Sequence, residues 1–207
     1  MVPLRKRLPL HPEPYFRQNL LLSKDLSIFY GDRCVANGIS LTLNRGDRIA
    51  LVGRNGCGKS SLLKLLVGQP IAHTGTLEIG SRLTVSYVPQ DMSFLSGSAD
   101  DFAAESEIDL TLFKTILRKL DFKRTQFTKD MSEFSMGQKK KVLLARSLCQ
   151  RANLYIWDEP LNYIDVISRL QIETLILEYK PTMLFVEHDE AFVNDIATKV
   201  CRISLNQ

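Results

Sequence analysis

The stretch that decides the fold is Ile49-Ala50-Leu51-Val52-Gly53-Arg54-Asn55-Gly56-Cys57-Gly58-Lys59-Ser60. Its first four residues are apolar and predict a buried strand over 48–52, and the leucines between 62 and 66 predict an apolar helix face over 59–67. The residues between them fit the pattern G-x-x-x-x-G-K-[ST] in the strand–loop–helix context that it requires. Glycines let backbone N–H groups curl around phosphate oxygens, and the following helix directs its positive N-terminal end at the same anion. The stretch therefore predicts a phosphate site.

Two side chains of this stretch can act on phosphates directly. Lys59 can reach the β and γ phosphates, and the Ser60 hydroxyl can bind Mg²⁺. Such a loop needs an acidic partner on a neighbouring strand, and the apolar run 154–157 is followed by Asp158 and Glu159. Asp158 would hold the metal, and Glu159 could orient and deprotonate an attacking water. Two acids after a strand are by themselves more often a solvated turn, but next to a phosphate loop we interpret them as part of the site.

Strand-like and helical segments alternate along the rest of the chain. Strands are predicted over 26–30, 39–43, 76–79, 83–88, 154–157, 182–186 and 200–203, and further helices over 137–150 and 165–179. Strands that alternate with helices favour a parallel sheet whose faces are covered. The predicted fold class is α/β.

The composition is that of a soluble globular protein. Of the 207 residues, 44% are hydrophobic and 24% are charged, and no run approaches the length of a transmembrane segment. Arg5, Lys6 and Arg7 are followed by prolines and not by the apolar stretch of a secretory signal. The four cysteines are far apart and include no C-x-x-C, so neither a zinc site nor a disulfide framework is indicated. We expect a reduced, cytoplasmic protein.

The charge is unevenly distributed. Residues 1–24 hold five basic residues and one acidic residue, so the whole net charge of +4 lies there. Residues 1–23 are rich in proline and are predicted to be a basic linker or tail. The segment 91–113 has six acids and no Lys or Arg, whereas 114–151 has eleven basic residues and three acids. We interpret residues 95–133 as a small helical insertion, and Lys139, Lys140 and Lys141 as part of a local basic surface.

Further motifs follow the phosphate loop in a fixed order. Phe134-Ser135-Met136-Gly137-Gln138 resembles the L-S-G-G-Q signature motif of the ATP-binding cassette (ABC) ATPases. Gln90 resembles the Q-loop glutamine of that family, His188 its switch histidine and Asp165 its D-loop aspartate, and Tyr30 fits the aromatic residue that stacks on adenine. The resemblance covers residues 24–204, and it implies that 24–207 form one nucleotide-binding domain.

The resemblance implies a fold, cofactors and site residues. The expected fold is that of a P-loop NTPase with a mostly parallel sheet, an N-terminal antiparallel β subdomain and a small helical subdomain. The expected activity is Mg²⁺-dependent hydrolysis of ATP. Catalysis is assigned to Glu159, His188 and Gln90, and Mg²⁺ to Ser60, Gln90 and Asp158. Nucleotide binding is assigned to Tyr30, Gly53, Asn55, Gly56, Cys57, Gly58, Lys59, Ser60, Ser61, Ser135, Gly137, Gln138 and Asp165.

Several of these residues also fit ordinary structural roles. Tyr30 could pack on a strand, His188 could cap a helix or lie in the core, and Gln90 could be a loop residue. Cys57 is interpreted as a small loop residue without redox chemistry, and Trp157 as a core residue. The order of the motifs favours the functional interpretation for the first three.

The signature motif implies a partner. In the family it serves the nucleotide of the opposite domain in a head-to-tail dimer, and this sequence has one phosphate loop and one signature motif. We therefore expect a second ABC cassette, in the same full-length chain or as a homodimer. Met136 replaces the usual first glycine, so its side chain must point away from the phosphate.

The segment after Glu159 distinguishes two classes within the family. Pro160-Leu161-Asn162-Tyr163-Ile164-Asp165 resembles the P-T-N-H-L-D of the F subfamily more than the P-T-S-A-L-D of transporters. Together with the signature motif it looks most like proteins that confer resistance to lincosamides, streptogramins A and pleuromutilins. The alternative is a nucleotide-binding subunit of a membrane transporter. A DNA-repair or chromosome-structure ATPase is excluded, because it would need a long coiled coil between Gln90 and Ser135 and only 44 residues lie there.

The basic leader resembles the end of the linker that joins two cassettes in the F subfamily. The expected partners of the full-length protein are the ribosome and its tRNA. The leader could equally be a cloning junction or a disordered tail, and the chain is expected to be truncated.

Overall fold

The structure is a computed structural model of the chain and describes residues 9–204. Contacts divide these residues into two compact units. The sheet unit comprises Pro12–Tyr87, Ala152–Glu159 and the residues from Lys180 onward, and the helical unit comprises Val88–Arg151, Pro160–Tyr179 and the described residues up to His11. The basic residues Arg5, Lys6 and Arg7 of the predicted tail lie outside the described residues.

A five-stranded sheet forms the centre of the sheet unit, with the strand order β10-β4-β9-β8-β6. Its strands are β4 (Arg48–Val52), β6 (Val85–Val88), β8 (Leu154–Asp158), β9 (Met183–Val186) and β10 (Lys199–Arg202). The pairs β10–β4, β4–β9 and β9–β8 are parallel. Every residue of β8 and β9 is buried, as expected for parallel strands that are covered on both faces.

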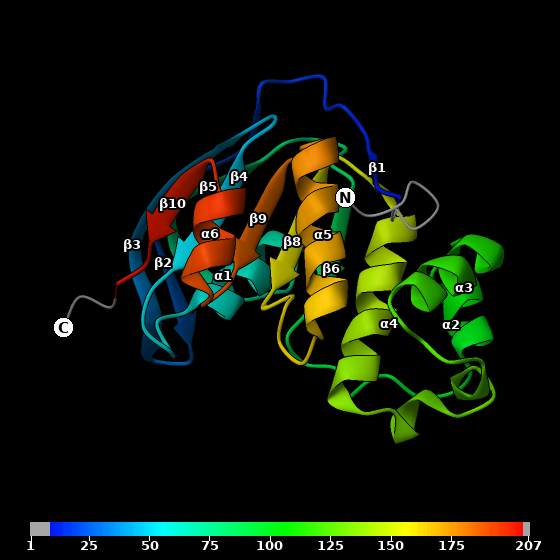
Figure 1. Cartoon of the computed structure of the whole chain (residues 1–207). Coiled ribbons are helices and arrows are strands. Elements are labelled where there is room, and N and C mark those ends of the chain that lie inside the picture. Colours follow the sequence, from blue (N-terminus) through cyan, green and yellow to red (C-terminus); the bar gives the residue numbers. More distant parts are fainter. Residues whose placement is uncertain (1–8, 205–207) are drawn as a thin grey trace. The chain divides into compact units, whose positions relative to one another are not determined.

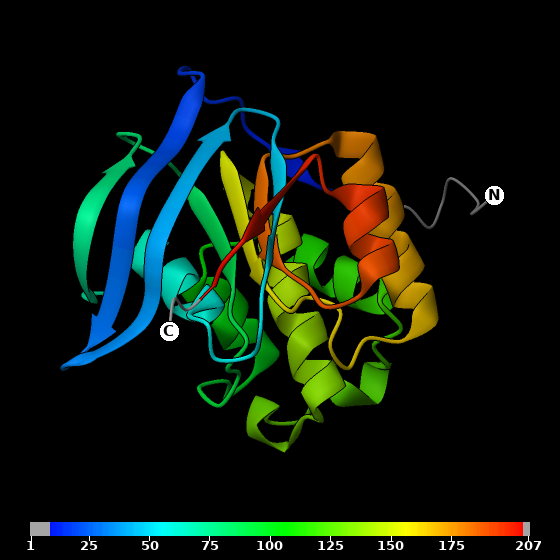
Figure 2. The same cartoon turned by 90° about the vertical axis from the view of Figure 1, so that its left-hand side faces the viewer.

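Helices cover both faces of this sheet (Figure 2). On one face α1 (Lys59–Leu66) contacts β8, and on the other the ring of Phe192 in α6 (Glu190–Ile196) packs edge-on against Phe185 of β9. The sequence prediction missed α6, although the Asp189 side chain caps it and Phe192, Val193 and Ile196 form its buried face.

A second, antiparallel sheet has the order β3-β2-β5, with β2 (Asn19–Tyr30), β3 (Arg33–Asn44) and β5 (Ala72–Ile79). Figure 2 shows its long strands beside α1. One hydrophobic cluster joins this sheet to α1 and to the central sheet, through residues such as Leu43, Leu62 and Ile156. A short sheet pairs β1 (His11–Pro12) with β7 (Arg151–Ala152).

The folded part of the chain begins earlier than predicted. The strand predicted over 26–30 starts at Asn19, because Leu20 and Leu21 pack into the core and pair with β3 and β5. Tyr15 is buried, and its hydroxyl donates a hydrogen bond to the carbonyl of Ser81. The prediction of a linker or tail is therefore wrong for residues 15–23.

The helical unit contains α2 (Ala99–Glu105), α3 (Leu110–Lys119), α4 (Met136–Cys149) and α5 (Val166–Tyr179), with short 3₁₀ turns η2 (Arg124–Gln126) and η3 (Met131–Glu133). Figure 1 labels the four helices, and α3 packs against both α2 and α4. Side chains of Ser98, Asp109 and Ser135 cap α2, α3 and α4. The predicted α/β class is confirmed, with a parallel sheet, an antiparallel β subdomain and a helical part.

Candidate functional site

Three predicted segments meet at one edge of the parallel sheet. The phosphate loop 53–60 follows β4, His188 follows β9 and Asp158 ends β8, and these three strands are parallel neighbours. The carboxyl ends of parallel strands share one edge of a sheet, which is where ligands bind in α/β folds. The sequence predicted each segment, and the position of β9 between the other two strands brings them together.

The backbone of the phosphate loop depends on Gly58, which is the residue before α1. Its φ angle is 85°, in the left-handed region that favours glycine. A Cβ atom at Gly58 would lie 2.6 Å from the carbonyl oxygen of Val35 and 2.6 Å from the Cβ of Ala36. The loop therefore lies directly against the start of β3.

Lys59 is held at the centre of this loop. Its side chain is buried, and its Nζ donates hydrogen bonds to the carbonyl oxygens of Gly53 (2.8 Å) and Arg54 (3.0 Å). These bonds keep an ammonium group within the loop, beside the N-terminal end of α1. The loop thus combines a cation, a helix N-terminus and a curled backbone, which together favour an anion.

The aromatic residue Tyr30 lies at the end of the β2–β3 hairpin. It pairs with Arg33 across a turn at Gly31, and its side chain is 48% exposed. Because β3 contacts the phosphate loop at Val35, this hairpin end is near the loop. An exposed ring at this place can stack on a planar ligand, and the contact of Tyr30 with adenine stays a prediction.

Asp158 is a fully buried carboxylate at the end of β8. Burial of the Tyr87 hydroxyl raises the pKa of Tyr87, and the negative charge of Asp158 raises it further. Burying a carboxylate is costly unless a partner or a metal compensates. Asp158 and the half-buried hydroxyl of Ser60 are hard oxygen ligands of the kind that Mg²⁺ prefers, so these residues fit a magnesium ion shared with substrate phosphates.

The described residues contain no group of three or more His, Cys, Asp or Glu side chains that could hold a metal by themselves.

Glu159 and His188 form a pair beside Asp158. The Glu159 Oε1 lies 3.4 Å from the His188 Nε2, and the Glu159 side chain is 13% exposed while that of His188 is 49% exposed. The backbone of Glu159 has a φ of 49° and its N–H donates to the carbonyl of Val186, whereas the N–H of His188 donates to the Glu187 Oε1. The largely buried carboxylate of Glu159 can accept a proton from water. The exposed imidazole of His188 can donate a hydrogen bond to an anion at the same edge of the sheet.

The other predicted site residues belong to the helical unit. Ser135 caps α4, because its Oγ accepts from the N–H of Gln138 while the Gln138 Oε1 accepts from the N–H of Ser135. Met136 at the first turn is 46% exposed, and Gln90 is also exposed. The structure brings Ser135, Gly137 and Gln138 together at the start of α4.

Asp165 acts as a structural anchor. Its carboxylate accepts from the Lys141 Nζ (2.7 Å), the Ser168 N–H (2.9 Å) and the Ser168 Oγ (2.8 Å). Burial raises the pKa of Asp165, but the hydrogen bonds from Lys141 and Ser168 outweigh that effect and lower it to about 2. The predicted contact of Asp165 with nucleotide stays a prediction.

The prediction of a basic surface beside the signature motif is wrong for two of its three lysines. Lys140 is 1% exposed, and the side chain of Lys141 is 11% exposed and paired with Asp165. Periodicity explains this outcome, because residues 140 and 141 fall on the face of α4 that also buries Leu144 and Leu148.

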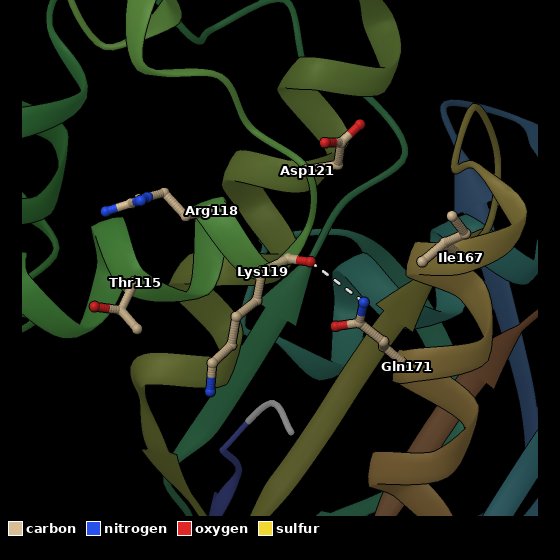
Figure 3. A pocket seen from close by; sticks show the side chains of 6 residues that line it. All are labelled: Thr115, Arg118, Lys119, Asp121, Ile167 and Gln171. Carbon is tan, nitrogen blue, oxygen red and sulfur yellow. Dashed lines mark hydrogen bonds between the residues drawn. The ribbon is translucent and has the colours of Figure 1, made fainter. Parts of the chain in front are cut away.

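Two cavities lie near these elements, one in each unit. A cavity of about 460 Å³ in the helical unit is lined by Thr115, Arg118, Lys119, Asp121, Ile167 and Gln171, none of them a predicted site residue (Figure 3). A cavity of about 300 Å³ in the sheet unit includes Gly53, Glu187 and His188, next to the phosphate loop. Among residues 9–204, no helix has both the length and the apolar character needed to cross a membrane.

Comparison with known proteins agrees with this arrangement. The family model described as ABC transporter matches residues 36–162. The chain is 35% identical over 193 residues to YdiF of Bacillus subtilis (strain 168), which covers 89% of this chain and 30% of that protein. It is 28% identical over 192 residues to ABC transporter F family member 2 of Arabidopsis thaliana, covering 90% of this chain and 28% of that one. The solved structure of RNase-L Inhibitor superposes with a TM-score of 0.72 at 25% identity, covering 93% of this chain and 38% of that one.

Proposed function

The chain belongs to the ABC transporter family of ATPase domains, and from this premise we propose that it binds and hydrolyses ATP with Mg²⁺ as one cassette of an ABC-F type protein. The observation that supports this most is the shared sheet edge, where the phosphate loop, Asp158, Glu159 and His188 follow adjacent parallel strands. Its curated relatives YdiF and ABC transporter F family member 2 are about three times longer, so the activity of the whole protein is part of the proposal.

Each group at this edge has a defined task. The loop N–H groups and Lys59 bind the β and γ phosphates, and Tyr30 stacks on adenine. Ser60 and Asp158 would hold Mg²⁺, which would neutralise phosphate charge. The predicted contact of Gln90 with Mg²⁺ stays a prediction, because Gln90 belongs to the helical unit. Glu159 orients the attacking water and accepts its proton as the bond between the β-γ bridging oxygen and the γ-phosphorus breaks, while His188 donates a hydrogen bond to the γ-phosphate.

The signature residues serve a second cassette. Ser135, Gly137 and Gln138 begin α4, where N–H groups and a hydroxyl can meet an anion. In a head-to-tail pair they would contact the nucleotide bound by the other cassette. We propose that the full-length protein uses this pairing on the ribosome to confer antibiotic resistance, which the resemblance of segment 160–165 to the F subfamily supports.

Substitution of the loop lysine tests the ATPase proposal. Lys59→Ala removes a charge-assisted contact to phosphate, so the Kd for ATP should rise by about ten- to hundredfold. The measurement is titration of the purified chain with a fluorescent ATP analogue and Mg²⁺. Lys64→Ala, in the last turn of the same helix, is the matched control and should bind like the wild type. Unchanged affinity in Lys59→Ala would sink the assignment of the phosphate loop.

Sedimentation tests the ribosomal proposal. Glu159→Gln should allow ATP to bind and block its hydrolysis, so the full-length variant should co-sediment with ribosomes in ATP. The full-length Lys59→Ala variant should stay in the supernatant under the same conditions. If both remain in the supernatant, or the gene also encodes transmembrane segments, the ribosomal role is lost and a transporter subunit becomes the better proposal.

A further inference from the structure

The first turn of α4 lies directly against the segment that follows Glu159. A Cβ atom at Gly137 would be 2.6 Å from the carbonyl oxygen of Tyr163, so only glycine allows this approach. Tyr163 has a φ of 65°, which is uncommon for a residue other than glycine. The helix start that we assign to phosphate binding and the backbone of residues 163–165 are therefore packed together within the helical unit.

One turn later, Lys141 fixes the same segment from the same face of α4. Positions 137 and 141 are four residues apart and so project on one side of a helix. The Lys141 Nζ lies 2.7 Å from the Asp165 Oδ2, and Asp165 also caps α5 through Ser168. Lys141 therefore holds a residue whose carboxylate sets the start of the next helix.

The helix that starts at Asp165 is itself tied to the end of α3. The Gln171 Nε2 donates to the carbonyl of Lys119 (3.3 Å), as Figure 3 shows, and the Ser168 Oγ lies 3.5 Å from the carbonyl of Leu120. These side chains satisfy carbonyl groups that the end of a helix leaves without intrahelical partners. The segment 163–165 is thus fixed on one side by α4 and on the other through α5 and α3.

Lys140 fixes a second motif segment. Its side chain is 1% exposed, and its Nζ donates to the carbonyl of Pro89 at 3.3 Å, directly before Gln90. Burying an ammonium group costs free energy, and an apolar side chain of similar volume is often neutral or stabilising at such a place. Stability alone therefore does not account for two shielded lysines in succession.

We propose that Lys141 and Lys140 are positioning residues for the ATPase reaction, an inference that rests on the proposed function. Lys141 aligns residues 163–165 with the phosphate-binding start of α4, and Lys140 aligns Gln90 with the same helix. Neither lysine contacts nucleotide or RNA. Together they present three motif segments as one rigid surface to the partner cassette.

Kinetics of Lys141 variants test this inference. Lys141→Met should lower kcat by about tenfold, which corresponds to the usual free-energy contribution of a shielded charge-assisted hydrogen bond. The Kd for ATP should stay within about twofold of the wild-type value, because Lys141 is not part of the phosphate loop. Lys141→Arg should restore kcat to within about threefold, since it keeps the charge. In an Asp165→Asn background, Lys141→Met should have little further effect, because its partner charge is already gone.

The matched control is Arg169→Met. It removes another ion pair of α5, that of Arg169 Nε with Glu173 Oε1 at 2.8 Å. Its kcat should stay close to that of the wild type. An equal loss of kcat in Lys141→Met and Arg169→Met would mean that both ion pairs act only by stabilising the helical unit. That result would overturn the inference that Lys141 is a positioning residue.

Hydrogen exchange of the nucleotide-free chain provides a readout that does not depend on hydrolysis. Exchange of the Ser168 amide should be about tenfold faster in Lys141→Met and unchanged in Lys141→Arg and Arg169→Met. Unchanged exchange in Lys141→Met would overturn the inference even if the enzyme is active. A wild-type chain that neither turns over nor binds ATP would instead overturn the proposed function, and the exchange result would still decide the inference.

Discussion

Asp165 is a residue of the helical unit whose ionisation is expected to affect the stability of the fold. Hydrogen bonds from Lys141 and Ser168 lower its pKa to about 2, against a usual value of 3.8. A carboxyl group with a lowered pKa stabilises the fold above its unfolded pKa, and this contribution is lost as the pH falls towards its folded value. The loss is therefore expected between about pH 4 and pH 2.

A carboxyl titration measures this effect. The Asp165 carboxyl, followed by carbon NMR, should titrate with a midpoint near 2 in the wild type and closer to 3.8 in Lys141→Met. In parallel, the stability advantage of the wild type over Asp165→Asn in urea should shrink below about pH 4. A wild-type midpoint near the usual value would show that the contacts with Lys141 and Ser168 do not persist in solution.

Single residues also show where a sequence stops being informative. The places of Lys59, Asp158 and Glu159 in the fold could be predicted because they depend on local spacing within a strand–loop–helix or at a strand end, whereas their roles stay predictions. The lysines of α4 could not, because three consecutive lysines predict an exposed surface and only the packing of α4 shows which two are shielded. The interaction of Asp165 with Lys141 joins residues 24 positions apart, and no pattern in the sequence predicts it.

At the scale of elements, the helices and strands with a strong apolar period were predicted closely. The strand over 48–52 is confirmed with the same bounds, and the helix predicted over 59–67 ends one residue earlier. The helix predicted over 137–150 begins at Met136, where Ser135 and Gln138 form a capping box. Local spacing suffices for such elements because their own side chains form the buried face.

Elements whose burial depends on distant parts of the chain were predicted poorly. The first residues of β2 are buried only because β3 and β5 pair with them. The strand β5 is 8 residues long, although a strand of four residues was predicted. The helix α6 has seven residues and was missed, since its apolar period covers barely two turns. Its Asp189 cap, followed by apolar residues at 192, 193 and 196, is the pattern that could have revealed it.

At the scale of the whole molecule, the site of one chain is incomplete by our proposal. The phosphate loop lies in the sheet unit and the signature residues in the helical unit, and a signature motif is expected to complete the site of another cassette. The sequence predicted the order of the motifs but not this separation, because the predicted helical insertion ended at residue 133 and left out the signature motif. The geometry within each unit could not be predicted either, because it depends on contacts between residues far apart in sequence, such as that of Lys141 with Asp165.

Pairing of cassettes should therefore depend on ATP. Glu159→Gln should bind ATP without hydrolysing it, so in ATP and Mg²⁺ its mass by light scattering should approach that of a homodimer. Without nucleotide it should be a monomer, and Lys59→Ala should stay monomeric in both conditions. A Glu159→Gln protein that stays monomeric in saturating ATP would show that a different cassette, and not a second copy, is the partner.

The strand order of the central sheet has a consequence for synthesis of the protein. β9, which separates β4 from β8 in the sheet, follows both of them in the sequence, at residues 183–186. Until β9 leaves the ribosome, β4 and β8 have no common neighbouring strand. The phosphate loop and Glu159, which follow β4 and β8, are then not held at one sheet edge. A nascent chain consequently lacks this shared edge until β9 has been made, so ATP would stabilise only molecules in which β9 has joined β4 to β8.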